Sequence, residues 1–357
     1  MHRVLAINPG STSTKFAVYF EDECVFRKTI RHPLEQLLRY KNVIDQFDLR
    51  KGIIIEALQE EGIEVDSIKY IIGRGGLTYP LESGVYRVNN QMIKHLREGV
   101  LGFHASNLGP ILADYIALQI PGAQAFMADP VVTDELDNVA RFAGHPKFER
   151  RSIFHALNQK ATARVHARKV GKHYKELNLI IAHLGGGISV GAHRKGRVVD
   201  VNNALDGEGC FSPERSGTLP AGQLIDLCLS GKYNRDQIRR MVVGEGGFVA
   251  YLGTNDALEV EKRVASGDKR AAEIQEALFY QVAKMIGEMA VVLSGNVDGI
   301  LLTGGLAFNN SLVDYISKKT AFIADVFVYP GEDELEALAK NGLLAARGEV
   351  EIKEYDK

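Results

Sequence analysis

Apolar and polar residues alternate in residues 3–30, RVLAINPGSTSTKFAVYFEDECVFRKTI. A period of two is typical of half-buried β-strands. A Gly-Ser-Thr run interrupts the alternation at 10–12, and a second polar stretch interrupts it near residue 21. The segment therefore predicts a strand, a tight turn, a second strand, a hairpin and a third strand.

The same pattern returns about half a chain length later, in NLIIAHLGGGISVGAHRKGRVVDV (178–201). Here a triple glycine forms the turn and Gly196 marks the hairpin. A repeated strand–glycine–strand unit defines the architecture before any single motif does. It predicts a duplicated α/β chain with domains at 1–154 and 155–357, in which each glycine turn lies at the cleft between the domains. The last helix, near 333–347, is expected to pack back on the N-terminal domain.

The remaining pattern predicts helices and short buried strands in alternation. Capping residues and glycines mark several ends, such as Asn89 before the helix 89–99 and Gly99 at its end. Residues 270–294 carry an apolar stripe at helical spacing. The tail GEVEIKEYDK (348–357) is charged and is expected to be solvated. The predicted helices are 48–62, 89–99, 108–119, 155–173, 221–231, 270–294, 309–318 and 333–346, and the further strands are 68–74, 123–130, 298–305 and 325–330.

Composition narrows the class of protein. The length of 357 residues predicts about two domains, and 45% apolar with 25% charged residues is ordinary for a globular protein. A net charge of −2 argues against a nucleic-acid or anionic-membrane partner. Three scattered cysteines exclude a disulfide framework, and no apolar run approaches the roughly 18 residues of a membrane span. A cytoplasmic protein is expected.

Three small-residue turns follow predicted strands, at 9–13, 185–187 and 303–305. Such turns expose backbone N–H groups that suit phosphate oxygens. The familiar P-loop pattern is absent, and the glycine spacing does not match a dinucleotide fingerprint. One turn of this kind would indicate only a hairpin, but three in a duplicated α/β chain favour a phosphate ligand.

Several motifs resemble the acetate kinase/butyrate kinase family. They are INPGSTSTK (7–15), GRGG (73–76), FHASN (103–107), AHLGGGISVG (182–191), SPERSGTLP (212–220) and LLTGGLAFNN (301–310). GRGG and SIFHALNQK (152–160) resemble the butyrate kinase branch more closely than the acetate kinases. The match extends along nearly the whole chain.

This resemblance implies a duplicated actin-like fold of the ASKHA, ribonuclease H-like type, with the active site in the interdomain cleft. It also implies reversible phosphoryl transfer between ATP and a short-chain fatty acid, butanoate + ATP giving butanoyl phosphate + ADP, with Mg²⁺. Isobutyrate and acetate stay open as acceptors. A homodimer or higher homo-oligomer is implied.

The chemistry explains which residue types to look for. A carboxylate acceptor is already anionic at neutral pH, so no general base is needed. Phosphoryl transfer depends on positioning and on stabilising negative charge. Cations, imidazoles, backbone donors and Mg²⁺ are therefore the expected groups.

The candidate residues fall into four groups. Those for catalysis are Arg215, His155, Asp129 and His183, and those for the acceptor are Arg74, His104 and Asn107. Those for nucleotide and phosphate are Ser11, Ser13, Lys15, Gly185, Gly186, Gly187, Asp256, Gly304, Gly305 and Asn309, and those for the metal are Asn8 and Glu334.

Some of these residues have a plain structural alternative. Asp256 and His104 are also suited to cap helices, and Arg215 could stabilise a surface turn. Glu332, Asp333 and Glu334 are equally suited to the first turn of a helix, where acids favour the dipole.

Two other classes of protein compete with a carboxylate kinase. A non-catalytic ATP-binding module would keep the phosphate turns without Arg215, Arg74 and His155. An ASKHA sugar kinase would need a base for its alcohol acceptor, and the zinc motif of the sugar-kinase repressor type is missing.

Overall fold

The computed structural model describes residues 2–357, without the side chain of Leu34, and the chain divides into two compact units. Residues up to Asp134, together with Asp333–Lys357, form unit 1, and Glu135–Glu332 form unit 2. The sequence placed the division 20 residues later, at 154/155. The last helix, α12 (Glu334–Ala346), packs on strands of unit 1.

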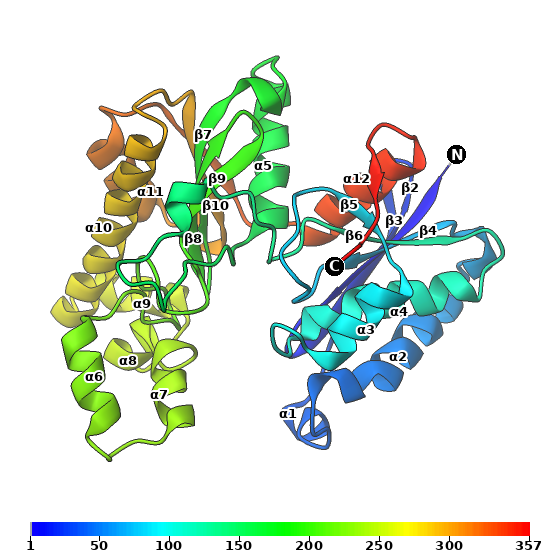
Figure 1. Cartoon of the computed structure of the whole chain (residues 1–357), viewed down its shortest axis with the longest axis horizontal. Coiled ribbons are helices and arrows are strands. Elements are labelled where there is room, and N and C mark those ends of the chain that lie inside the picture. The colour runs from blue at the N-terminus through cyan, green and yellow to red at the C-terminus, as the bar shows by residue number, and fades with distance from the viewer. Residues whose placement is uncertain (1) are drawn as a thin grey trace. The chain divides into compact units, whose positions relative to one another are not determined.

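Unit 1 is built on a seven-stranded sheet in the order β12-β5-β6-β4-β1-β2-β3 (Figure 1). β1, β2 and β3 form an antiparallel meander, whereas β4 and β6 run parallel to β1. The strands are β1 (Arg3–Pro9), β2 (Ser13–Phe20), β3 (Glu23–Arg31), β4 (Tyr70–Arg74), β5 (Val85–Arg87), β6 (Gln124–Ala128) and β12 (Ile352–Lys353).

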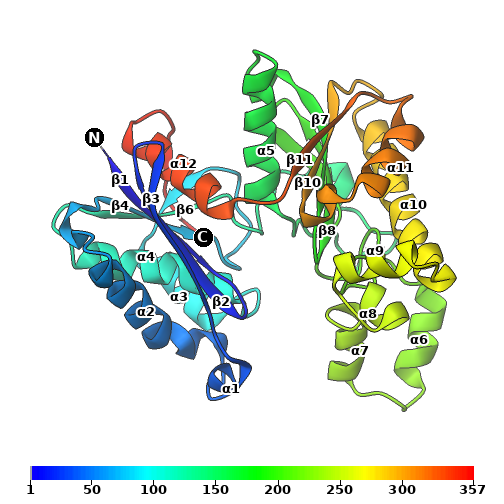
Figure 2. The ribbon, with the colours of Figure 1, turned by 180° about the vertical axis from the view of Figure 1, so that it is seen from behind.

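Helices cover both faces of this sheet. Successive side chains of a strand point to opposite faces. On β4, Gly73 lies against Gly109 of α4, and its neighbour Ile72 lies against Gly342 of α12. Figure 2 shows α12 over the strands on one side and α2, α3 and α4 on the other. The other helices of unit 1 are α1 (Leu34–Leu37), α2 (Phe47–Glu60), α3 (Asn90–Glu98) and α4 (Leu108–Leu118).

Unit 2 repeats the same plan on a five-stranded sheet in the order β11-β10-β7-β8-β9. β7, β8 and β9 form the meander, and β10 and β11 run parallel to β7, as β4 and β6 do beside β1. The predicted duplication is thereby confirmed. The strands are β7 (Asn178–Leu184), β8 (Ile188–Arg194), β9 (Arg197–Val201), β10 (Gly299–Gly304) and β11 (Val326–Pro330).

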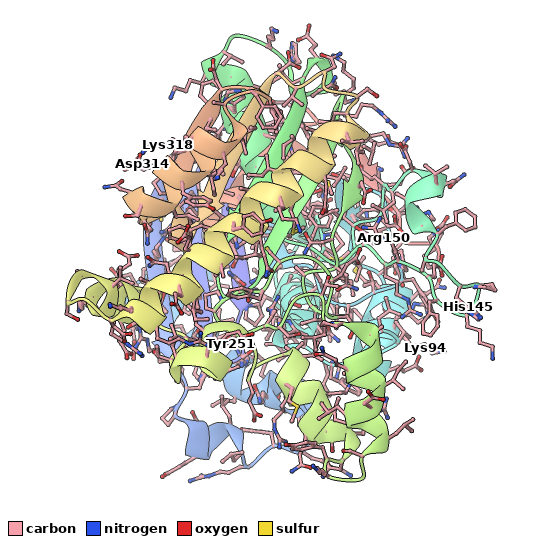
Figure 3. All side chains as sticks on the ribbon, turned by 90° about the vertical axis from the view of Figure 1, so that its left-hand side faces the viewer. Lys94, His145, Arg150, Tyr251, Asp314 and Lys318 are labelled. Atoms are coloured by element: carbon pink, nitrogen blue, oxygen red, sulfur yellow. The ribbon has the colours of Figure 1, made fainter. Side chains whose placement is uncertain are left out.

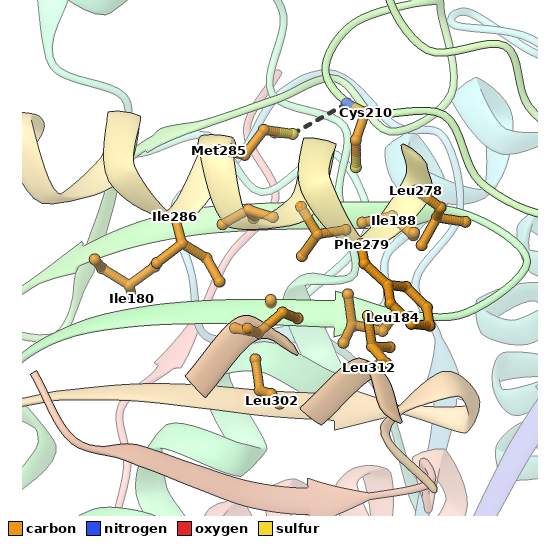
Figure 4. Close-up of a cluster of buried hydrophobic side chains, with 14 of the residues drawn as sticks. Ile180, Leu184, Ile188, Cys210, Leu278, Phe279, Met285, Ile286, Leu302 and Leu312 are labelled. Carbon is orange, nitrogen blue, oxygen red and sulfur yellow. Dashed lines mark hydrogen bonds between the residues drawn. The ribbon is translucent and has the colours of Figure 1, made fainter. Parts of the chain in front are cut away.

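The long helix α10 supplies more of the main core cluster of unit 2 than any other element. Ile274, Leu278, Val282 and Met285 of the predicted stripe are all buried against the sheet. Figure 4 shows α10 over strands of the sheet, with the sulfur of Met285 accepting the N–H of Cys210 at 3.0 Å. The helices of unit 2 are α5 (Ala156–Lys169), α6 (Ala221–Leu229), α7 (Arg235–Val242), α8 (Gly247–Leu252), α9 (Ala257–Ala265), α10 (Lys269–Val292) and α11 (Asn310–Thr320).

The expectation of a solvated tail is wrong. β12 adds a short strand beside β5, and Tyr355 is buried with its hydroxyl 2.8 Å from Nδ1 of His95. The charged residues around Tyr355 hide this role, because a single buried aromatic gives no periodic signal. Within residues 2–357, no helix combines the length and apolarity that crossing a bilayer requires.

The contact between α4 and β4 leads to a stability prediction. A Cβ at Gly109 would overlap the backbone carbonyl of Arg74, whereas a Cβ at Gly52 of α2 would meet nothing within 4 Å. We expect Gly109→Ala to lower the free energy of unfolding by about 1–3 kcal/mol through overpacking. Gly52→Ala, a matched change in a helix, should raise it by about 0.5–1 kcal/mol. Urea unfolding of both variants measures this, and equal effects would contradict the close packing.

Candidate active site

The first glycine turn joins β1 to β2 and exposes its polar groups. The N–H of Gly10 donates to the carbonyl of Ser13 at 2.8 Å, which closes the turn. Ser11 and Thr12 are exposed, and their N–H groups make no hydrogen bond to another residue in 2–357. Lys15 lies opposite Asn8 in the strand register and is half-buried. The turn thus offers unsatisfied donors to an anion.

Asn8, Arg74 and Glu334 meet at the ends of β1 and β4 and the start of α12. Glu334 is buried and accepts a hydrogen bond from Nδ2 of Asn8 at 2.5 Å. Arg74 holds the same carboxylate with two nitrogens, at 2.8 and 2.9 Å, and donates to Oδ1 of Asn8 at 3.3 Å. Such a bidentate pair neutralises both charges.

The structure separates the three consecutive acids. Glu334 is the acid that accepts from Asn8. Asp333 caps α12 by accepting from the N–H of Glu336 at 2.9 Å, and it pairs with Arg27 at 2.6 Å. Glu332 belongs to unit 2, where it lies 3.4 Å from Nε2 of His183.

Asn8 and Glu334 suit Mg²⁺ as ligand types. Magnesium prefers oxygen ligands and usually binds one or two carboxylates together with waters and substrate phosphates. Residues 2–357 contain no cluster of three His, Cys, Asp or Glu side chains that would hold a metal alone. Arg74 balances the charge of Glu334. Asn8 and Glu334 are therefore better suited to a Mg²⁺ ion that binds together with a phosphate ligand than to one that the protein holds permanently.

Asp129 ends β6 in an unusual conformation. Its φ is +38°, a region that residues other than glycine rarely occupy, and Pro130 follows it. The buried carboxylate accepts from Oγ of Ser83 at 2.5 Å and from the N–H of Gly84 at 3.1 Å. Strain of this kind concentrates at functional sites.

The two acceptor candidates in FHASN have structural contacts of their own. Nδ1 of His104 accepts from the N–H of Ser106 at 3.2 Å, so His104 caps the short turn at 105–107. Asn107 is fully buried, and its amide bonds the backbones of Leu77, Leu96 and Gly102. Asn107 therefore shapes the surrounding loops in this structure.

In unit 2, the rings of His155 and His183 stack face to face. Their centroids are 3.7 Å apart and their planes differ by 13°. Nδ1 of His183 lies 2.8 Å from Oδ1 of Asn158, and Nδ1 of His155 lies 2.9 Å from Oγ of Ser189. The stacked pair is thus held in place from both sides by neutral hydrogen-bond partners.

A buried polar chain continues behind His155. The amide nitrogen of Gln159 donates to Oγ of Ser189 at 2.9 Å, and its oxygen lies 2.9 Å from Nε2 of His193. Nδ1 of His193 lies 2.5 Å from the hydroxyl of Tyr174. As Gln159 is oriented, His193 donates from Nε2 and accepts at Nδ1.

Arg215 packs directly against the second glycine turn. A Cβ at Gly187 would overlap its guanidinium, which donates to the carbonyl of Ala204 at 2.6 Å. Its Nε is buried without a hydrogen-bond partner, and no carboxylate in residues 2–357 forms an ion pair with it. Burial lowers the pKa of Arg215 below its usual range. A guanidinium with a buried, unpartnered Nε and no carboxylate beside it is suited to bind an anion.

The remaining nucleotide candidates also lie in unit 2. Thr303 pairs with His183 across β10 and β7, so the turns after these two strands are neighbours. A Cβ at Gly304 would overlap the carbonyl of Leu184, and Gly305 faces open space. Asn309 caps α11 and Asp256 caps α9, which matches the structural alternative for Asp256.

The sequence did not single out Arg50, Ser189, Gln159 or His193. Arg50 lies under the first turn, and the other three form the chain behind His155. Ser189 and His193 lie two and six residues after the triple glycine, on the same strand β8. Their spacing places Ser189 and His193 on one face, which was the available signal.

Comparison with known proteins gives concordant results. Residues 146–324 match the acetokinase family. Over 353 residues the chain is 51% identical to butyrate kinase 2 of Clostridium acetobutylicum, with 99% of each chain covered.

Solved structures that resemble this one include an acetate kinase and a propionate kinase. Acetate kinase of Porphyromonas gingivalis has a TM-score of 0.79 at 17% identity, covering 97% of this chain and 100% of its own. A propionate kinase of Francisella tularensis has a TM-score of 0.76 at 18% identity, covering 95% and 98%. These likenesses confirm the predicted two-domain fold of the ASKHA type.

The chain behind His155 predicts a loss of stability in acid. Burial, and then the charge of Lys160, lowers the pKa of His193 well below 6.5. His193 therefore stays neutral when folded and takes up a proton only on unfolding. The free energy of unfolding should fall as pH drops below about 6.5, by up to ~1.4 kcal/mol per pH unit from this residue.

Urea unfolding at pH 7.5 and 5.5 tests this. His193→Gln should show a smaller loss between the two pH values than the wild type. His145→Gln is the control, because His145 is exposed on a surface loop (Figure 3). An equal pH dependence in all three proteins would contradict a buried neutral His193.

Proposed function

Because the chain belongs to the acetokinase family, we propose that it transfers a phosphoryl group reversibly between ATP and a short-chain fatty acid, with butyrate as the acceptor. The observation that carries this proposal is Arg215, a half-buried arginine without a carboxylate partner, whose Nε is buried without a hydrogen bond and whose guanidinium lies against the 185–187 turn. The butyrate assignment rests on the 51% identity to butyrate kinase 2.

Arg215 binds the phosphoryl group during its transfer. Negative charge spreads over the three equatorial oxygens in the transition state. A guanidinium that has already lost part of its water interacts more strongly with this charge than a fully hydrated one, and its planar donors match phosphate geometry. Gly186 is the exposed residue of the adjoining 185–187 turn, and the backbone of this turn would bind the nucleotide phosphates.

His155 and His183 supply a second set of donors. Ser189 and Asn158 each occupy one ring nitrogen, Nδ1, and thereby fix both ring orientations. We assign to His155 and His183 the stabilisation of charge on the transferring group. Neither residue needs to act as a base, because the acceptor is already ionised.

The polar residues of unit 1 bind phosphate and metal in this proposal. Ser11, Ser13 and Lys15 would contact phosphate, and Asn8 and Glu334 would hold the ligands of Mg²⁺. Bound with ATP, Mg²⁺ would neutralise part of the triphosphate charge. Asp129, held by Ser83 and Gly84, would orient a water or a neighbouring donor.

Arg74 is the proposed contact for the acceptor carboxylate. Its pair with Glu334 and Asn8 uses Nη1 and Nη2, and no residue in 2–357 accepts a hydrogen bond from its Nε. Guanidinium has five N–H donors, so the Nε edge remains for a second carboxylate. His104 and Asn107 would shape the acceptor site through the loops they hold.

We further propose a homodimer or larger homo-oligomer that acts in the cytoplasm. The most detailed part of the proposal is which short-chain acid the enzyme prefers as acceptor. One methylene in an apolar pocket changes binding by only about 1–3 kcal/mol, so acetate and isobutyrate are expected to react more slowly rather than not at all.

A direct assay tests the function. ATP, Mg²⁺ and a panel of acetate, propionate, butyrate and isobutyrate, with hydroxylamine trapping, should give the most acyl hydroxamate from butyrate. Butyryl phosphate with ADP should yield ATP. If no short acid or acyl phosphate reacts while ATP still binds, the chain is a non-catalytic ATP-binding module, and turnover with glucose alone would indicate a sugar kinase.

Substitution of Arg215 tests its role. Arg215→Ala should lower kcat and kcat/KM together by about 10²–10³-fold, with little change in ATP affinity, since the contact forms mainly in the transition state. Arg239→Ala is the matched control, because Arg239 is exposed on α7 and its ion pair with Asp206 is long, at 3.9 Å. A rise in the KM for butyrate alone would make Arg215 a ground-state binder instead.

A further inference from the structure

Beneath the first glycine turn lies a fully buried arginine that the mechanism above does not use. Arg50 belongs to α2 and has no exposed surface. No carboxylate in residues 2–357 pairs with it. Long charged side chains are rarely buried without a partner, because the desolvation cost is high. The position of Arg50 therefore requires an explanation.

Neutral oxygens take up all of its donors. Nε and Nη2 donate to Oε1 of Gln46 at 3.2 and 2.8 Å. Nη1 donates to the carbonyl of Ser13 at 2.7 Å and to Oγ1 of Thr14 at 3.1 Å, and Nη2 reaches the carbonyl of Ser11 at 3.4 Å. The five hydrogen bonds satisfy the guanidinium, but none cancels its positive charge.

These bonds also set the direction of the turn. In a planar trans peptide the C=O and the N–H point opposite ways. Since the carbonyl of Ser11 faces Arg50, the N–H of Thr12 points away from it, and that N–H has no partner among residues 2–357. The peptide dipole and the guanidinium thus present positive charge in the same direction.

The neighbouring histidine adds no second positive charge. His32 lies 2.8 Å from Oγ1 of Thr14, and its backbone N–H donates to the carbonyl of Thr12. Burial, and then Arg50, lowers the pKa of His32. Burial lowers the pKa of Arg50 to about 10, so it remains charged at neutral pH while His32 is neutral.

We propose that Arg50 is a positioning residue, which holds the 9–13 turn in its phosphate-binding form and places a permanent positive charge beneath it. This inference rests on the proposed function, because that function assigns Ser11 and Ser13 to phosphate. The positive charge is uncompensated in the free protein, and a bound phosphate would balance it. Arg50 does not touch the ligand and acts through the turn.

The test measures phosphate binding apart from catalysis. Calorimetric titration with inorganic tripolyphosphate should show an affinity at least tenfold weaker in Arg50→Met than in the wild type. Arg50→Lys, which keeps the charge but cannot hold both carbonyls, should lose threefold or more. In turnover assays the KM for ATP should rise in parallel, whereas the KM for butyrate stays within twofold.

Lys51→Met is the matched control. It removes one positive charge from the next residue of α2, where Lys51 is partly exposed and pairs with Asp48 at 2.6 Å. Tripolyphosphate affinity should then stay within twofold of the wild type. A purely structural role for Arg50 would lower the unfolding temperature and the active fraction, without a selective loss of phosphate affinity.

The outcomes separate this proposal from the proposed function. The positioning role is overturned if the wild type does not bind tripolyphosphate, or if a folded Arg50 variant binds it within twofold of the wild type. If Arg50→Met does not fold, Arg50→Lys decides by the threefold criterion. Failure of the wild type to phosphorylate any short acid would remove the kinase assignment, while the tripolyphosphate comparison would still judge Arg50.

Discussion

Burial of positive charge without a carboxylate partner is the constraint around which both units are arranged. Arg50 is fully buried and held by several neutral oxygens, whereas Arg215 is half-buried, donates to one carbonyl and leaves a buried Nε unpartnered; each lies against a glycine turn. Each comes from the connection that follows the third strand of a meander, so the two repeats use the same place in the topology. Burial of this kind costs free energy, which the two hydrophobic cores must offset. Arg74 is the contrast, since Glu334 neutralises it.

The duplication gives the two units one frame and different chemistry. Asn8 and His183 both precede the last residue of the first strand of a repeat, and both face polar partners brought by the C-terminal segment 332–334. In unit 1 those partners form a neutral set with Arg74. In unit 2 they adjoin a stacked imidazole pair. In both units the parallel strands end at the same edge of the sheet. Different polar residues can therefore occupy that edge in the two units without any change in the hydrophobic core.

The sequence predicted the elements that have strong local signals, whereas it missed the short elements β5, α7 and α8. These signals depend on the spacing of residues within a short window. Examples are the meanders at 3–30 and 178–201, the Asn89 cap with Gly99 at φ +64°, and the apolar stripe of α10. The motif resemblance identified the family for the same reason. The tail was mispredicted because Tyr355 is buried by residues more than 250 positions away, such as His95.

The charged contacts of the candidate site lie beyond such windows. Glu332, Asp333 and Glu334 have equal claims by type, yet they reach His183, Arg27 and Asn8. Arg50 looks like any helical arginine, and only the folded chain shows that its five donors all meet neutral oxygens. The sequence around a long charged side chain does not indicate its partner, because the partner depends on which strands and helices pack together. Charge placement is thus a property of the tertiary structure, whereas element type is largely a property of the segment.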